Sequence, residues 1–90
     1  MGAHHTSMSA EDTVAAIKAR VAEAIPGCRV DAAGGGGHFT IEVVSDAFAG
    51  LNSLKKQRMV YRAIKDLMAG DDAPVHAVDS LKTVTPAQAG

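Results

Sequence analysis

Residues 34–44 read GGGGHFTIEVV, four glycines followed by seven residues in which polar and apolar side chains alternate almost throughout. The alternation places Phe39, Ile41 and Val43 on one face, which is the pattern of a strand with one buried side. Before the glycines, residues 28–32 (CRVDA) alternate in the same way. We therefore expect an antiparallel hairpin whose connection is the glycine run.

Two amphipathic segments flank this hairpin, and each predicts a helix. The first runs from about residue 10 to 25, with Ser9 as the N-cap and Asp12 at the position that closes a capping box. The second runs from about residue 53 to 68. In both, apolar residues recur every three or four positions and form one stripe. The stripe residues are Val14, Ile17, Val21 and Ala24, then Leu54, Tyr61, Ile64 and Met68 with Val60 and Leu67 beside them.

A third extended segment is expected at residues 75–84, which are rich in β-branched residues and end before Thr85-Pro86. The order helix, strand, strand, helix, strand predicts an α+β fold, a two-layer sandwich of a three-stranded sheet and two helices. The second helix is long enough to be a crossover between parallel strands. The sequence leaves open which strand pairs with the third.

Length and charge restrict the class of protein. The chain has 90 residues and a net charge of −1, which suits a single domain, expected at 8–90, without a global attraction for phosphate. No apolar run is long enough to cross a membrane and no secretory signal is present, which predicts a cytoplasmic protein. Residues 1–7 (MGAHHTS) are interpreted as a vector-derived tag remnant, with a natural metal-binding tail as the alternative.

The single cysteine, Cys28, excludes an internal disulfide and an all-cysteine metal site. We expect a small buried hydrophobe, with a reactive or metal-bound thiol as the alternative. Any metal must then be held by histidine or carboxylate, or be shared with a second protein. No nucleophile stands beside a histidine base and no carboxylate pair marks a cleft, so we expect no catalytic residues and no enzyme activity.

Four blocks between residues 37 and 86 resemble the BolA-like family, in the same order. They are GHF with IEVVS (37–39 and 41–45), FAGL (48–51), KKQRMVY (55–61), and VHAV with TP (75–78 and 85–86). The KKQ of the third block is similar to the acid-stress-linked bacterial branch of the family. Between His76-Ala77 and Thr85-Pro86 the chain has one residue more than the family pattern, which predicts a β-bulge near Asp79-Ser80.

The resemblance implies an adaptor with a fold like that of class II KH domains. Family members bind monothiol glutaredoxins, and a 2Fe-2S cluster is bridged between the two proteins, for iron-sulfur trafficking or for iron and stress signalling. The BolA-like partner supplies the histidine of the Val-His-Ala block and often a His or Cys from the loop between the first two strands. These positions are His76 and His38 here. The isolated protein should hold no cluster and be a monomer, with a weak homodimer as the alternative.

Taken as residues alone, both histidines have a second interpretation. His76 suits a half-buried strand histidine bonded to a backbone carbonyl, and His38 an exposed polar residue beside a turn. A neutral imidazole is nevertheless a good ligand for iron. A 2Fe-2S cluster takes four ligands, so two histidines require a partner to supply the others.

Five cations of the second helix segment support another function. No acidic residue lies between positions 47 and 65, so these cations lack intrahelical ion pairs. They predict a DNA-binding transcriptional regulator as the alternative to the adaptor, or else an acidic partner surface or only a solvated face. The cations are Lys55, Lys56, Arg58, Arg62 and Lys65. The glycine run itself is no KH loop, because it joins strands where a KH loop joins helices.

Overall fold

The computed structural model describes residues 8–90, so the interpretation of residues 1–7 as a tag lies outside the described part of the chain. The long elements follow the expected order of helix, strand, strand, helix, strand, with three short helical turns added. The elements are α1 (Ala10–Ala24), β1 (Arg29–Gly35), β2 (His38–Val44), the 3-10 helix η1 (Asp46–Phe48), α2 (Ser53–Ala63), α3 (Lys65–Met68), β3 (Ala77–Val84) and α4 (Pro86–Ala89).

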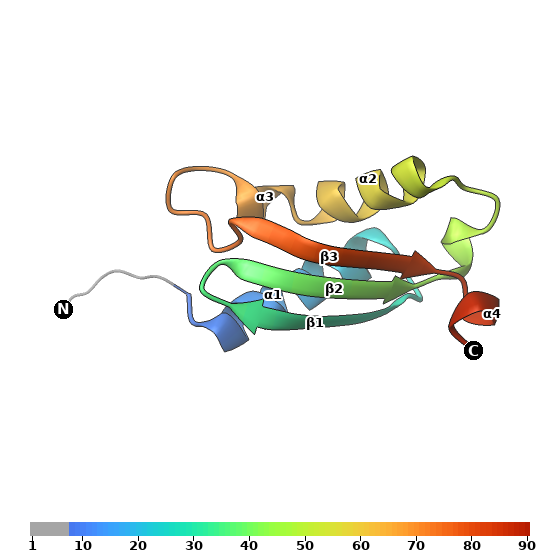
Figure 1. Ribbon diagram of the computed structural model, residues 1–90, viewed down its shortest axis with the longest axis horizontal. Helices are drawn as coiled ribbons and strands as arrows, with labels where there is room; N and C mark the ends of the chain where they lie inside the picture. The colour runs from blue at the N-terminus through green and yellow to red at the C-terminus, as the bar shows by residue number, and fades with distance from the viewer. Residues whose placement is uncertain (1–7) are drawn as a thin grey trace.

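The strands form one sheet in the order β1-β2-β3. β1 pairs with β2 in antiparallel fashion, as expected for a hairpin, and β2 pairs with β3 in parallel. This settles the pairing that the sequence left open, because α2 and α3 form the crossover that parallel neighbours require. Figure 1 shows α1 behind the strands and α2 running along β3, while no helix of residues 8–90 lies in front of the sheet. The fold class is therefore the expected α+β sandwich.

The hairpin turn is shorter than the glycine run. Gly35 pairs with His38, so only Gly36 and Gly37 lie between the paired positions. Both have positive φ, +62° and +85°, as a two-residue type I′ turn requires. The expectation of a first strand over 28–32 was too short, because strand pairing uses the backbone and Gly34 and Gly35 can extend it without side chains.

The core lies between the sheet and the helices. Phe39, Ile41 and Val43 are 2%, 3% and 0% exposed, which confirms the predicted inner face of β2. Ile17 and Val21 of α1 are fully buried against them. Ser9 caps the N-terminus of α1 as expected, because its hydroxyl accepts the N–H of Asp12 at 3.0 Å. The expected capping box is not completed, since no hydrogen bond within residues 8–90 joins the Asp12 side chain to the N–H of Ser9.

The second helix differs from its prediction. It ends at Ala63, and α3 adds one further turn. The buried residues of this segment are Val60 of α2, Ile64 between the two helices and Leu67 of α3. Their spacing of four and three makes one stripe. Leu54 and Tyr61 were expected on this stripe but are 53% and 37% exposed, because they lie about 100° or more around the helix from it.

Candidate metal-ligand site

His76 lies on the surface, immediately before β3. Its neighbour Val75 is 1% exposed and donates its N–H to the carbonyl of Leu67 at 3.0 Å. On the other side, the N–H groups of His76 and Ala77 both donate to the carbonyl of Gly37, at 2.8 and 3.0 Å. The backbone of His76 is thus held from both sides while its side chain stays exposed, and the imidazole is not sealed inside the core.

The His76 ring occupies space that a side chain at Gly37 would fill. A Cβ built on Gly37 would lie 2.8 Å from Cγ of His76, 2.9 Å from its Nδ1 and 3.2 Å from its Cβ. These distances put the Nδ1 side of the ring against the turn. Glycine at this position is therefore required twice, for the positive φ and for the approach of the imidazole.

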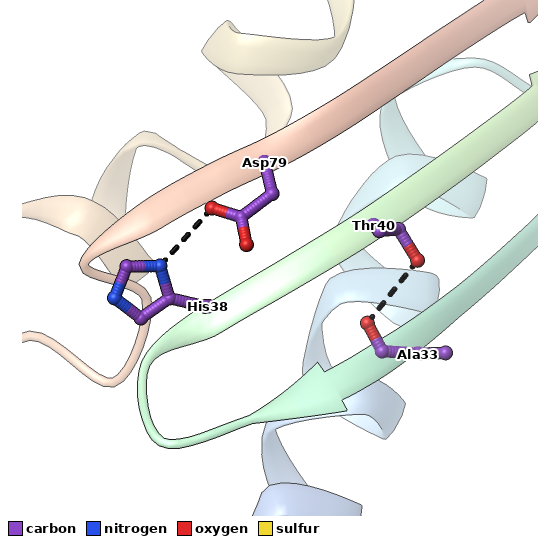
Figure 2. Close-up of polar contacts among 4 residues, drawn as sticks. All are labelled: Ala33, His38, Thr40 and Asp79. Carbon is purple, nitrogen blue, oxygen red and sulfur yellow. Dashed lines mark hydrogen bonds and ion pairs between the residues drawn. The ribbon is translucent and has the colours of Figure 1, made fainter.

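His38 begins β2 on the face of the sheet opposite to the helices, where its side chain is 59% exposed. Its Nδ1 lies 3.0 Å from Oδ1 of Asp79 (Figure 2). The register shows why Asp79 reaches it. Phe39 pairs with Val78 and the next residue of β2 with Ser80, so Asp79 is the extra residue of a β-bulge. The bulge predicted from the sequence is confirmed, but the contact of Asp79 with His38 was not anticipated. The extra residue between His76-Ala77 and Thr85-Pro86 was the only sequence feature that pointed to this part of β3.

The two histidines are brought to the same end of the sheet. His38 pairs with Ala77, the residue after His76. Gly37 directly precedes His38, and its carbonyl accepts the N–H groups of both His76 and Ala77. Nowhere in residues 8–90 do three or more metal-binding side chains gather. Two exposed imidazoles fit a cluster that a second protein also ligates, and they do not fit one held by this chain alone.

Cys28 is distant from this site. It precedes Arg29, which pairs with Val44 at the far end of the hairpin from His38, about 20 Å away at the rise of a strand. The thiol is half-buried and its Sγ lies 3.9 Å from the carbonyl oxygen of Val21. Burial raises the pKa of the Cys28 thiol. The hydrophobe interpretation suits this position better than the ligand interpretation.

The basic residues of the second helix do not all share a face. Lys55, Arg58, Arg62 and Lys65 are exposed and recur at spacings of three, four and three, which makes one line opposite the buried stripe. Lys56 is half-buried and lies about 140° around the helix from that line, near the buried stripe. Within the described part of the chain, none of the five forms an ion pair with an acidic group.

Comparison with known proteins decides the family. The family model described as BolA-like protein matches residues 9–88. The chain belongs to the BolA-like family. The resemblance seen in the four sequence blocks is thereby confirmed over nearly the whole chain.

Individual relatives agree with this assignment. The chain is 34% identical over 92 residues to BolA-like protein 1 of Mus musculus, with 91% of this chain and 64% of the relative covered. It is 39% identical over 59 residues to the acid stress protein IbaG of Escherichia coli K12, with 66% and 67% covered. The chain thus spans less than two thirds of the mouse relative's length. The solved structure of a BolA homologue from Coxiella burnetii superposes with a TM-score of 0.71 at 33% identity, with 92% of this chain and 97% of that one covered.

No helix within residues 8–90 is long and apolar enough to span a membrane.

Proposed function

We propose that this protein is an adaptor that binds a monothiol glutaredoxin and completes the coordination of a shared 2Fe-2S cluster, for iron-sulfur trafficking or iron and stress signalling. The observation that carries the proposal is the His76 imidazole. It is exposed, its backbone is fixed by Val75 in the core and by the Gly37 carbonyl, and no protein group within residues 8–90 hydrogen-bonds to its ring nitrogens. Such a ring retains a lone pair for a metal.

His38 is the second ligand of this proposal. It projects from the strand next to β3, one residue beyond the turn that His76 contacts, and it is exposed on the uncovered face of the sheet. The name acid stress protein, carried by the E. coli relative, supports a stress-related setting.

A bound cluster supplies electron transfer and a transferable iron-sulfur unit, with a reduction potential that rises when histidine replaces thiolate. This chain's contribution is to present imidazoles at a rigid position. The parallel pairing of β2 with β3 and the two hydrogen bonds to the Gly37 carbonyl hold the end of the sheet in place. A ligand on such a scaffold loses little conformational entropy when the partner arrives.

The test is to mix the protein with a cluster-loaded monothiol glutaredoxin and record visible absorption and circular dichroism. We expect the spectrum to change on mixing, and the change to be lost with His76→Ala and reduced with His38→Ala. Thr40→Ala is the matched control, because Thr40 is exposed on the same face of β2 two residues from His38. An unchanged spectrum with the wild-type protein would overturn the adaptor proposal.

Complex formation is measured separately from ligation. Titration calorimetry with the cluster-free glutaredoxin should give the same affinity for the wild-type protein and for His76→Ala, if that histidine acts on the cluster rather than on the protein interface. A His76→Ala variant that binds neither form of the glutaredoxin would instead assign His76 to the interface, which contradicts its role as a ligand.

DNA binding is the second candidate function, and the line Lys55, Arg58, Arg62 and Lys65 favours it. The four side chains are exposed, point away from the core and have no acidic neighbour to neutralise them within the described residues. Four phosphate contacts predict that affinity falls by roughly 100-fold when the salt concentration is raised fourfold. The net charge of −1 limits this proposal to a local surface.

The DNA proposal is tested by fluorescence titration of a duplex at two salt concentrations. Arg58→Glu with Arg62→Glu should abolish binding at low salt. Lys18→Glu with Arg29→Glu is the control, because it makes the same change of net charge at exposed cations on α1 and β1. Equal loss in both double variants, or no binding at low salt, would refute a specific role for α2.

A further inference from the structure

The bulge in β3 places a carboxylate beside a proposed metal ligand. Asp79 has no partner on β2, because the register steps from Val78 opposite Phe39 to Ser80 opposite the following residue. Figure 2 shows its side chain over the uncovered face of the sheet, directed at the ring of His38. Oδ1 of Asp79 and Nδ1 of His38 are 3.0 Å apart, a hydrogen-bonding distance.

This contact specifies which nitrogen of His38 is protonated. An ionised carboxylate has no proton to give and only accepts hydrogen bonds, so Nδ1 of His38 must be the donor. In the neutral ring the lone pair then belongs to Nε2. This is the less common tautomer of a free imidazole in water, so the contact opposes the ring's intrinsic preference.

Metal-ligating histidines in proteins commonly donate their other ring N–H to a carboxylate, which fixes the tautomer and the ring direction. The arrangement of Asp79 and His38 has this form. Both side chains are more than half exposed, 54% and 59%, so a second protein can reach the ring. The contact arises from the register of β3, in which Asp79 is the residue without a partner on β2.

We propose that Asp79 is a positioning residue that holds His38 in the Nδ1–H tautomer and presents Nε2 to a metal held by the partner. The tautomer claim concerns the isolated protein, whereas the presentation to metal rests on the proposed adaptor function. The bulge is the structural device, because a strand without Asp79 would keep Val78 opposite Phe39 and Ser80 opposite Thr40, and would leave no carboxylate at this point.

The first test needs no partner. Two-dimensional NMR of ¹⁵N-labelled protein in mildly alkaline buffer distinguishes a protonated from an unprotonated ring nitrogen. We expect His38 to show a protonated Nδ1 and a free Nε2 in the wild-type protein, and to revert to the common tautomer with Asp79→Ala. Asp79→Asn should retain the Nδ1–H form, because its amide oxygen can still accept. Asp31→Ala is the control, since Asp31 is an exposed carboxylate on β1.

The second test uses the cluster-loaded glutaredoxin. Asp79→Ala should need about tenfold more protein to give the same spectral change, as removal of such hydrogen-bond partners does at metal sites. Asp31→Ala should respond at the wild-type concentration. A wild-type protein that gives no response to the glutaredoxin overturns the adaptor function and the metal role of Asp79, but not the tautomer. A ring of His38 whose nitrogen shifts are identical in the wild type and in Asp79→Ala overturns the positioning proposal, whatever the glutaredoxin does.

Discussion

A single methyl group added at Gly37 tests the contact that positions His76. The new Cβ would lie 2.8 Å from Cγ and 2.9 Å from Nδ1 of His76, about 1 Å inside the optimal separation of nonbonded atoms. The His76 backbone is restrained, because its N–H donates to the Gly37 carbonyl at 2.8 Å. We therefore expect Gly37→Ala to turn the imidazole away from the hairpin.

Gly36→Ala is the matched control, because Gly36 also has positive φ but an added Cβ there meets nothing within 4 Å. A left-handed backbone costs an alanine about 1–2 kcal/mol, of which the stiffer unfolded chain offsets about 0.4–1 kcal/mol. The expected loss in free energy of unfolding is thus about 1 kcal/mol for Gly36→Ala by these terms. Gly37→Ala adds about 0.5–1.5 kcal/mol for an imidazole forced off its rotamer.

Urea denaturation of both variants measures this difference, and NMR chemical shifts of the His76 ring report its displacement. The cluster-loaded glutaredoxin provides a third readout: Gly37→Ala should lose much of the spectral response, and Gly36→Ala should keep it. Two variants with equal urea midpoints and equal chemical shifts of the His76 ring would show that the ring does not pack against Gly37. Contact with the imidazole would then not be a reason for glycine at this position.

Three further predictions concern stability and reactivity. Phe39→Ala should remove about 3–5 kcal/mol from the free energy of unfolding, because the ring is 2% exposed in the core; a urea midpoint within error of the wild type would contradict this. Burial raises the pKa of the Cys28 thiol, so a disulfide reagent should modify it at pH 8 more slowly than the thiol of Ala33→Cys at an exposed position of β1, and equal rates would contradict this. The Arg20 guanidinium donates to Asp66 at 3.0 Å and lowers the pKa of that carboxyl below its ordinary 3.8. The pair should therefore add stability that is present above pH 3.8 and is lost as the pH falls through the lowered pKa of the folded state. Asp66→Asn should make the urea midpoint less dependent on pH in that range. A variant whose midpoint falls on acidification as steeply as that of the wild type would contradict the assignment.

Local pattern was enough to predict the order of the long helices and the strands. Alternation at Phe39, Ile41 and Val43 identified β2 and its buried face, and all three are buried. Periodicity did less well on the second helix. Leu54 and Tyr61 are apolar and near the right spacing, but hydrophobicity alone does not report where the sheet ends, and both proved exposed.

The site was only partly predictable. The Val-His-Ala block singled out His76 by resemblance, and the extra residue indicated a bulge that the register of β3 confirms. What the bulge does was not predictable, because the hydrogen bond joins residues separated by 41 positions. The clearance that His76 needs at Gly37 likewise depends on two segments that meet only in the folded chain.

The order of side chains along this polypeptide was sufficient to determine the order and approximate place of the two long helices and three strands, because backbone periodicity and capping are properties of near neighbours. Pairing of β3 with β2 was decided only by the three-dimensional packing, since either outer arrangement would have satisfied the same apolar faces. That pairing brings His38, Asp79, His76 and Gly37 to one end of the sheet, and contacts between distant segments of this kind leave no periodic trace in the chain from which they could be read.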